Sequence, residues 1–127
     1  MKGMKKIYCW LLCLLFVATA TAQQRGLKQL LGRWESADGE GIELVDSTRL
    51  FLLYHGEKKL VSDYQIDFTR SPYWFDFTLK DSSGIHQIKS LLLVVNDDLL
   101  QWQIFEDFRP SEFDPSKGEM IYLKRRR

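Results

Sequence analysis

The sequence predicts an all-β protein, an antiparallel up-and-down barrel of about eight strands. Short segments in which apolar and polar residues alternate with a period of two recur along the chain, as in strands that have one solvated face. Asp, Asn, Ser and Gly residues, which favour turns, separate nearly all of these segments. Short strands in sequential hairpins favour a barrel or a sandwich, and we expect the barrel.

The clearest alternation lies in residues 63–80, DYQIDFTRSPYWFDFTLK. In its first half, Tyr64 and Ile66 alternate with acidic and amide residues. Pro72 then interrupts the pattern, because proline lacks the N–H group that a central strand needs. From Tyr73 onward, aromatic and aliphatic residues again occupy every second position. The stretch therefore predicts an antiparallel hairpin with one strongly aromatic face.

The remaining elements follow from the same patterns. Leucines at helical spacing predict one short helical turn over residues 23–31. The predicted strands comprise residues 33–36, 41–45, 49–54, 59–68, 73–80, 85–95, 99–105 and 119–124. The long connection over residues 106–118 contains Pro110 and Pro115, which exclude regular strand pairing there. We expect a single domain over residues 23–127.

Residues 1–22 have the composition of a secretory signal peptide. Three lysines are followed by an apolar run over residues 7–17 and then by small residues with an A-x-A spacing. The apolar run is shorter than the roughly 20 residues that cross a membrane. We expect export to the periplasm or beyond, with cleavage before Gln23. Cys9 and Cys13 both lie in the signal, so the mature domain would contain no disulfide.

The mature domain would carry a slight excess of acidic residues. Removing Lys2, Lys5 and Lys6 from the 18 basic residues leaves 15, against 17 acidic residues. Four of the remaining positive charges lie together at the end of the chain, from Lys124 to Arg127. Because nucleic-acid binding needs a spread of phosphate contacts, we expect no nucleic-acid partner. The terminal cluster is interpreted as a solvated tail or as a weak contact with an anionic envelope surface.

The period of two also predicts which side chains face the interior of the barrel. Within each predicted strand, the face that carries the polar residues is assigned to solvent and the alternate positions to the core. The predicted inward set comprises Trp34, Ile42, Leu44, Leu50, Leu52, Tyr54, Tyr64, Ile66, Tyr73, Phe75, Phe77, His86, Ile88, Ser90, Leu92, Val94, Leu100, Trp102, Ile104, Ile121 and Leu123. An eight-stranded barrel has an interior that side chains fill or that holds one small ligand, and the sequence leaves both outcomes open.

Three segments of the chain together resemble a known family. Residues 31–34, LGRW, are similar to the G-x-W segment that opens lipocalin-like barrels. Residues 64–76 contain the spacing Y-x-I-D-x-T-x-x-P-x-x-x-D, and residues 109–113, RPSEF, precede residues 121–125, IYLKR. This series resembles a lipocalin-like family first described as an uncharacterised planctomycete domain, over about residues 30–125. The resemblance implies a barrel, and it implies no activity because the family has no established one.

Two residues of these segments have both a structural and a functional interpretation. Trp34 either closes one end of the barrel as part of the core or lines a ligand pocket. Arg109, in the longest connection, either binds a partner at the rim or ties the loop down through backbone carbonyls or Asp107. The structural interpretation is favoured for both residues.

The leading functional hypothesis is a monomeric, non-enzymatic binding module for a small apolar or amphipathic ligand. The apolar part of the ligand would lie against aromatic side chains in the barrel, and tyrosine hydroxyls or the histidine ring would fix its polar end. Many apolar groups with a few polar ones are typical of small-molecule pockets. The candidate ligand-binding residues are Tyr54, Tyr64, Tyr73, Phe75, Phe77, His86 and Trp102.

Two other classes of function are weighed against this hypothesis. A protein-binding module, such as an envelope protease inhibitor, would offer residues 23–28 to its partner as a mobile end. An enzyme would use Asp67 and Asp76 as paired carboxylates, or His86, and the sequence shows no evident partner for any of them. We expect no cofactor, and no zinc site, because the mature domain has two histidines and no cysteine.

Overall fold

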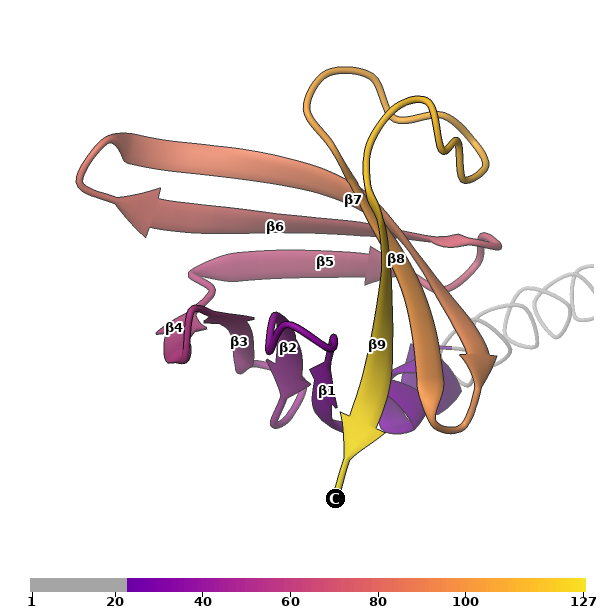
Figure 1. Ribbon diagram of the computed structural model, residues 1–127. Helices are drawn as coiled ribbons and strands as arrows, with labels where there is room; N and C mark the ends of the chain where they lie inside the picture. The colour runs from indigo at the N-terminus through magenta and orange to yellow at the C-terminus, as the bar shows by residue number, and fades with distance from the viewer. Residues whose placement is uncertain (1–22) are drawn as a thin grey trace, which may run out of the picture.

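The computed structural model describes residues 23–127, which form one short helix and one β-sheet (Figure 1). The helix occupies residues 23–30, as the leucine spacing predicted. The strands are β1 (Gly32–Glu35), β2 (Gly41–Leu44), β3 (Leu50–Tyr54), β4 (Glu57–Leu60), β5 (Asp63–Asp67), β6 (Tyr73–Asp81), β7 (Gly84–Asn96), β8 (Leu99–Phe105) and β9 (Met120–Arg126). The expected signal peptide lies outside the described residues. No helix in the described part of the chain has the length and the apolar stretch that crossing a membrane requires.

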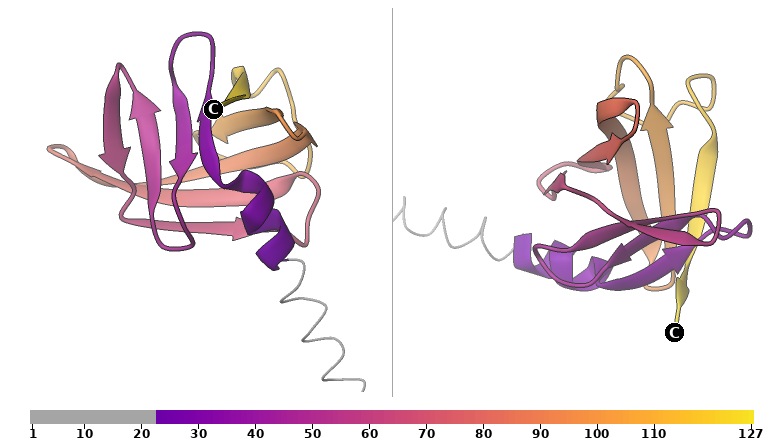
Figure 2. Two further views of the ribbon diagram at one scale, coloured as in Figure 1. Left: turned by 90° about the horizontal axis from the view of Figure 1, so that it is seen from below. Right: turned by 90° about the vertical axis from the view of Figure 1, so that its left-hand side faces the viewer.

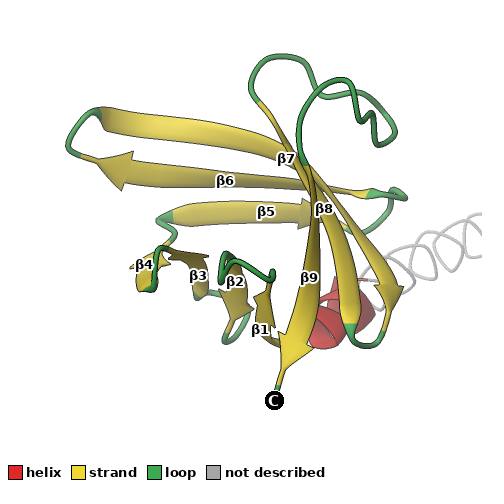
Figure 3. Ribbon diagram, viewed as in Figure 1, coloured by secondary structure: helices red, strands yellow, loops and turns green. Residues whose placement is uncertain are grey.

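All strands belong to one antiparallel sheet in the order β4-β3-β2-β1-β9-β8-β7-β6-β5. The sheet curls strongly, so that β1 to β4 cross beneath β5, β6 and β7 (Figures 1 and 3). The two outermost strands, β4 and β5, do not pair with each other, and the sheet is therefore a half-barrel rather than a closed barrel. The all-β, barrel-like prediction is confirmed, with 9 strands in place of about eight.

The additional strand arises at a corner of the chain between β4 and β5. The Val61 N–H donates to the carbonyl of Leu50 at 2.9 Å, and the Ser62 N–H donates to the carbonyl of Thr78 at 3.3 Å. Successive residues therefore bond to opposite sides of the half-barrel. Val61 is buried whereas Leu60 is exposed, so the alternation changes phase at this point. The prediction of one continuous strand over residues 59–68 was wrong for this reason.

Large side chains fill the concave side of the sheet. The rings of Phe75, Phe77 and Trp102 pack together, with centroids 5.0 to 6.1 Å apart. The indole N–H of Trp102 donates to the Ser90 hydroxyl at 2.9 Å, and that hydroxyl donates to the carbonyl of Phe75 at 2.7 Å. These hydrogen bonds satisfy the polar atoms that the core encloses. The other fully buried core residues are Leu30, Trp34, Ile42, Leu44, Leu50, Leu92, Leu100 and Leu123.

Trp34 closes the end of the half-barrel next to the helix. It is completely buried, and its indole N–H donates to the carbonyl of Leu30 at 2.9 Å. The guanidinium of Arg125 lies 4.1 Å from its ring centroid and donates to the carbonyls of Leu31 and Gln29, at 2.7 and 2.9 Å. These contacts join the last strand, the first strand and the helix. They agree with the structural interpretation of Trp34.

Both ends of the described chain lie in regular secondary structure. Residues 23–28, expected to be mobile, are helical, and Gly26 approaches Phe68 so closely that a Cβ would lie 2.2 Å from that ring. At the other end, β9 runs to Arg126, which pairs with Glu35 at 3.0 Å and, by this hydrogen bond, lowers the pKa of that carboxyl. Arg127 pairs with Asp98 at 2.9 Å. The cluster is thus the end of a strand rather than a tail, while Lys124, Arg126 and Arg127 are exposed to solvent as expected. Contact with an anionic envelope stays a prediction.

Candidate functional site

The long connection between β8 and β9 folds back over the convex, outer face of the sheet, where a buried glutamine anchors it. The amide nitrogen of Gln103 donates to the carbonyls of Asp114 and Gly118, at 2.6 and 2.9 Å. Its amide oxygen accepts a hydrogen bond from the Asp114 N–H at 3.0 Å. Gly118 lies so close to β8 that a Cβ there would be 2.9 Å from the carbonyl oxygen of Ile104. Residues 106–119 are therefore fixed to the sheet near their C-terminal end.

Arg109 anchors the same loop near its beginning. Only 6% of its side chain is exposed, and the guanidinium pairs with the carboxylate of Asp76 on β6. Its Nη1 donates to the carbonyl of Ser90 at 3.4 Å, and the guanidinium lies 3.9 Å from the ring centroid of Trp74. Arg109 thus ties the loop down, as its structural interpretation states, but its carboxylate partner is Asp76 rather than Asp107.

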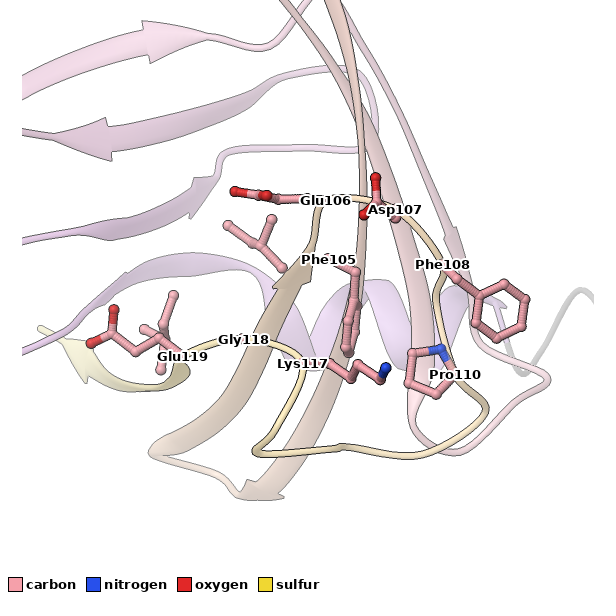
Figure 4. Close-up of a pocket in the computed structure, with 10 residues that line it drawn as sticks. Phe105, Glu106, Asp107, Phe108, Pro110, Lys117, Gly118 and Glu119 are labelled. Carbon is pink, nitrogen blue, oxygen red and sulfur yellow. The ribbon is translucent and has the colours of Figure 1, made fainter.

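A pocket of about 720 Å³ opens beneath this loop, where β8 and β9 diverge beyond the pair of Gln103 and Met120 (Figure 4). Its volume falls within the roughly 300 to 1,000 Å³ that is usual for small-molecule sites. The apolar lining comprises Ile104, Phe105, Phe108, Pro110 and Ile121, and the polar lining comprises Glu106, Asp107, Lys117, Gly118 and Glu119.

Figure 4 shows how the labelled side chains are distributed around the pocket. Phe105 and Lys117 extend toward the space that the loop encloses, whereas Glu106 and Glu119 extend to the opposite side of the diverging strands. Phe108 lies on the outer limb of the loop and is 81% exposed. An aromatic side chain with that exposure beside a cavity is available for contact with a ligand.

The structure brings together only part of the ligand site expected from the sequence. Phe75, Phe77 and Trp102 do meet in the interior, where they pack on one another. The predictions that Tyr54 and His86 face the interior were wrong, because Tyr54 is 53% exposed and 47% of the His86 side chain is exposed. Tyr54 is the last residue of β3. His86 lies near the start of β7, before the pairing of β7 with β8 begins at Lys89.

The two remaining tyrosines serve local packing. The hydroxyl of Tyr64 donates to the carbonyl of Ser47 at 2.8 Å, and partial burial, with the nearby charge of Asp46, raises the pKa of Tyr64. The ring of Tyr73 lies edge-on to Phe68, with the two centroids 4.9 Å apart. Tyr64 and Tyr73 therefore lie partly in the core, away from the exposed Tyr54.

Residues of three catalytic types converge at the turn between β6 and β7. The Nε2 atom of His86 lies 2.8 Å from the Ser83 hydroxyl and 3.2 Å from the carboxylate of Asp81. In a catalytic triad the serine and the carboxylate contact opposite nitrogens of the imidazole, whereas here both contact Nε2. Hydrogen bonds from the Ser83 hydroxyl, at 2.6 Å, and from the Ser83 N–H, at 2.8 Å, are the largest causes that lower the pKa of the Asp81 carboxyl to about 2. The cluster is a hydrogen-bonded turn rather than an activated nucleophile.

The carboxylates of Asp67 and Asp76 are each occupied by an arginine. Hydrogen bonds from Thr69, with Arg70 at 3.2 Å, hold the pKa of Asp67 below its usual range. A glycosidase-type general acid needs a raised pKa, so this shift has the opposite direction. Within residues 23–127, no group of three or more His, Cys, Asp and Glu side chains has an arrangement that could hold a metal ion.

A comparison of the chain with protein-family models, with curated proteins and with solved structures finds no match. The lipocalin-like resemblance stays a prediction. The candidate site is therefore defined by the geometry of the loop and of the pocket beneath it.

Proposed function

We propose that this chain is an exported, non-enzymatic binding module that takes a small amphipathic ligand in the pocket beneath residues 106–119. The observation that supports this location is the cavity of about 720 Å³ under a loop that two buried side chains anchor. The interior, by contrast, is occupied by packed side chains, among them Trp34, Phe75 and Trp102. The proposal thus keeps the ligand class expected from the sequence and moves the site from the interior to the loop.

The lining of the pocket suggests how such a ligand would be held. An alkyl or ring portion would bury its surface against Phe105, Ile104 and Ile121, at about 25 cal/mol for each Å² removed from water. The pocket lining carries three carboxylates and one ammonium, with Asp107 and Lys117 on the loop and Glu106 and Glu119 on the opposite side of the diverging strands. This net negative charge favours a cationic headgroup over an anionic one.

Thermal unfolding with three decyl amphiphiles below their micelle concentrations tests the proposal. Decyltrimethylammonium is expected to raise the melting temperature, decyl maltoside to raise it less, and decyl sulfate least. A ligand at 100 times its dissociation constant adds about 2.7 kcal/mol of stability, which corresponds to several degrees in a domain of this size.

A pair of variants locates the binding site. Phe108→Ser removes an exposed side chain of the pocket and should weaken decyltrimethylammonium binding several-fold without loss of stability. Tyr54→Ser is the matched control, because Tyr54 is also an exposed aromatic residue and lies outside the pocket lining. Equal binding by both variants and the wild-type chain, or no stabilisation by any of the amphiphiles, would refute the proposal.

A further inference from the structure

The connection between β8 and β9 has two parts that are held to the sheet unequally. We call residues 106–113 the first limb and residues 114–119 the second limb. Figure 2 shows the whole connection, in orange to yellow, at the end of the molecule that lies away from the N-terminal helix. Both limbs form the wall of the proposed pocket, the first through Phe108 and Pro110 among others and the second through Lys117.

A network of hydrogen bonds holds the second limb. The fully buried amide of Gln103 makes three hydrogen bonds of 2.6 to 3.0 Å with Asp114 and Gly118. Within the limb, the backbone N–H groups of Ser116 and Lys117 donate to Asp114, each at 3.0 Å. Detachment of this limb would leave a buried amide without partners, which is costly.

The first limb has no comparable network. Within the described chain, no backbone N–H of residues 107–113 donates a hydrogen bond. The anchor is the side chain of Arg109, and its contact with the carbonyl of Ser90, at 3.4 Å, is longer than the usual length of about 2.9 Å. The carboxylate of Asp76, the charged partner of Arg109, is 44% exposed, so water competes for this pair.

The docked position of Arg109 also leaves a buried donor without an acceptor. Only 6% of the side chain is exposed, and its Nε atom is enclosed but forms no hydrogen bond within residues 23–127. A buried N–H group without a partner costs free energy, which is recovered when the group reaches water. Release of Arg109 therefore has a compensation that release of the Gln103 contacts lacks.

The connection covers a small part of the outer face of the sheet. Leu91 on β7 lies opposite Trp74 on one side and opposite Gln103 on the other, so the three side chains share this face. Leu91 is completely buried, although it lies outside the core cluster of the concave side. Because Arg109 stacks on Trp74 and Gln103 bonds to the second limb, the connection is what buries Leu91.

We infer that the first limb detaches from the sheet by local opening while the second limb stays docked, and that the first limb is the gate of the pocket. Opening takes Arg109 into water and removes the part of the wall that Phe108 and Pro110 form. A loop with few anchors can open in this way without unfolding of the sheet. That a ligand passes this gate rests on the proposed function, whereas the opening itself does not.

Thiol labelling of single-cysteine variants of residues 23–127 tests the opening, because this part of the chain contains no cysteine. Leu91→Cys places a thiol beneath the connection, and Leu100→Cys, equally buried in the concave core, is the matched control. With excess dithiobis-nitrobenzoate, Leu91→Cys should react more than about tenfold faster, at a rate that low urea concentrations barely change. Equal rates, or a rate for Leu91→Cys that rises with urea as global unfolding does, would overturn the inference.

Two further substitutions, each made in the Leu91→Cys chain, identify the anchor. Asp76→Asn removes the charge that balances the buried Arg109 and should accelerate labelling several-fold. Asp67→Asn is the matched control, because Asp67 pairs with Arg70 outside the connection. Equal acceleration by both substitutions, or none by Asp76→Asn, would contradict release of the limb at Arg109.

Relaxation dispersion of the unsubstituted chain is an independent measurement that needs no variant. Exchange on the microsecond to millisecond timescale should occur at the amides of residues 107–113 and not at Asp114 and Gly118. Equal exchange in the two limbs would overturn the separate opening of the first limb.

Decyltrimethylammonium distinguishes a failure of the gate from a failure of the proposed function. Saturation with this amphiphile should slow the labelling of Leu91→Cys, because a ligand beneath the connection stabilises the docked limb. Rapid labelling that the amphiphile does not slow would support the opening and refute the proposed function. Binding of the amphiphile to a Leu91→Cys chain that is labelled no faster than Leu100→Cys would contradict the gate alone.

Discussion

The two faces of β8 are both buried, but by different means. On the concave face, Leu100 and Trp102 lie in an apolar core that many residues share. On the convex face, Gln103 and Phe105 are covered by residues 106–119, a loop that a few polar contacts fasten. Loss of one contact in a shared core is costly, whereas a loop on a few anchors can change without unfolding the sheet. We therefore place stability on the concave face and binding on the convex face.

The largest expected effect comes from the concave face. Phe75→Ala should destabilise the domain by about 3–5 kcal/mol, because it leaves a cavity beside Phe77 and Trp102. Phe108→Ser, on the loop, should change stability by no more than about 0.5 kcal/mol. Urea unfolding of both variants measures the difference. Similar losses from the two substitutions would contradict the distinction between the faces.

An intermediate effect is expected from the buried glutamine. Gln103→Ala should cost about 1–3 kcal/mol, because it leaves the carbonyls of Asp114 and Gly118 without their donor. Gln101→Ala is the control on the same face of the same strand, where the amide donates to the sulfur of Met120 at 3.2 Å. Hydrogen exchange in residues 106–119 should become faster in Gln103→Ala alone. Unchanged exchange would show that Gln103 does not anchor the loop.

Arg109→Lys should have a smaller effect on stability, of about 1 kcal/mol, because half-exposed Asp76 can be solvated when the pair loosens. Its effect on the pocket should be larger, with decyltrimethylammonium binding weakened several-fold, since lysine lacks the planar group that stacks on Trp74. Arg70→Lys is the control, as Arg70 also lies over Trp74, at 3.8 Å, but pairs with Asp67 outside the loop. If Arg70→Lys weakened decyltrimethylammonium binding equally, the contacts of Arg109 would not be what maintains the pocket.

The smallest effect is expected at the exposed turn between β6 and β7. Ser83→Ala should raise the pKa of Asp81 from about 2 toward its ordinary value of 3.8. A lowered folded-state pKa contributes stability above about pH 4, and this contribution is lost as the pH falls toward 2. An NMR titration of the Asp81 carboxyl measures the shift, with Ser82→Ala as the control. A pKa of Asp81 that stays near 2 in Ser83→Ala would show that this hydroxyl is not the cause.

The alternation of residues predicted the concave face well, because a period of two reports which side chains share a face. The same alternation failed for Tyr54 and His86, because it shows which side chains share a face of the strand but not whether another part of the chain covers that face. At His86 only β6 lies beside β7, and the pairing with β8 begins at Lys89. The phase change at Val61 was equally hidden, as nothing in the local composition marks the corner.

The convex site could not be predicted in the same way. Gln103 is a polar residue at an outward position, which the alternation assigns to solvent. Its partners are backbone atoms of Asp114 and Gly118, whose positions depend on the conformation of the whole loop. Arg109 and Asp76 did belong to the segments that resemble a lipocalin-like family, but their pairing joins residues that are 33 positions apart. Only the folded chain shows that these residues enclose a pocket.

The most direct measurement is an NMR titration of residues 23–127 with decyltrimethylammonium. The side-chain amide of Gln103 and the backbone amides of Lys117, Gly118 and Glu119 should shift in proportion to binding, because they form or contact the pocket. The indole N–H of Trp102, inside the core, should stay in place. A shift of the Trp102 signal with an unchanged Gln103 amide would place the ligand in the interior and contradict the proposed site.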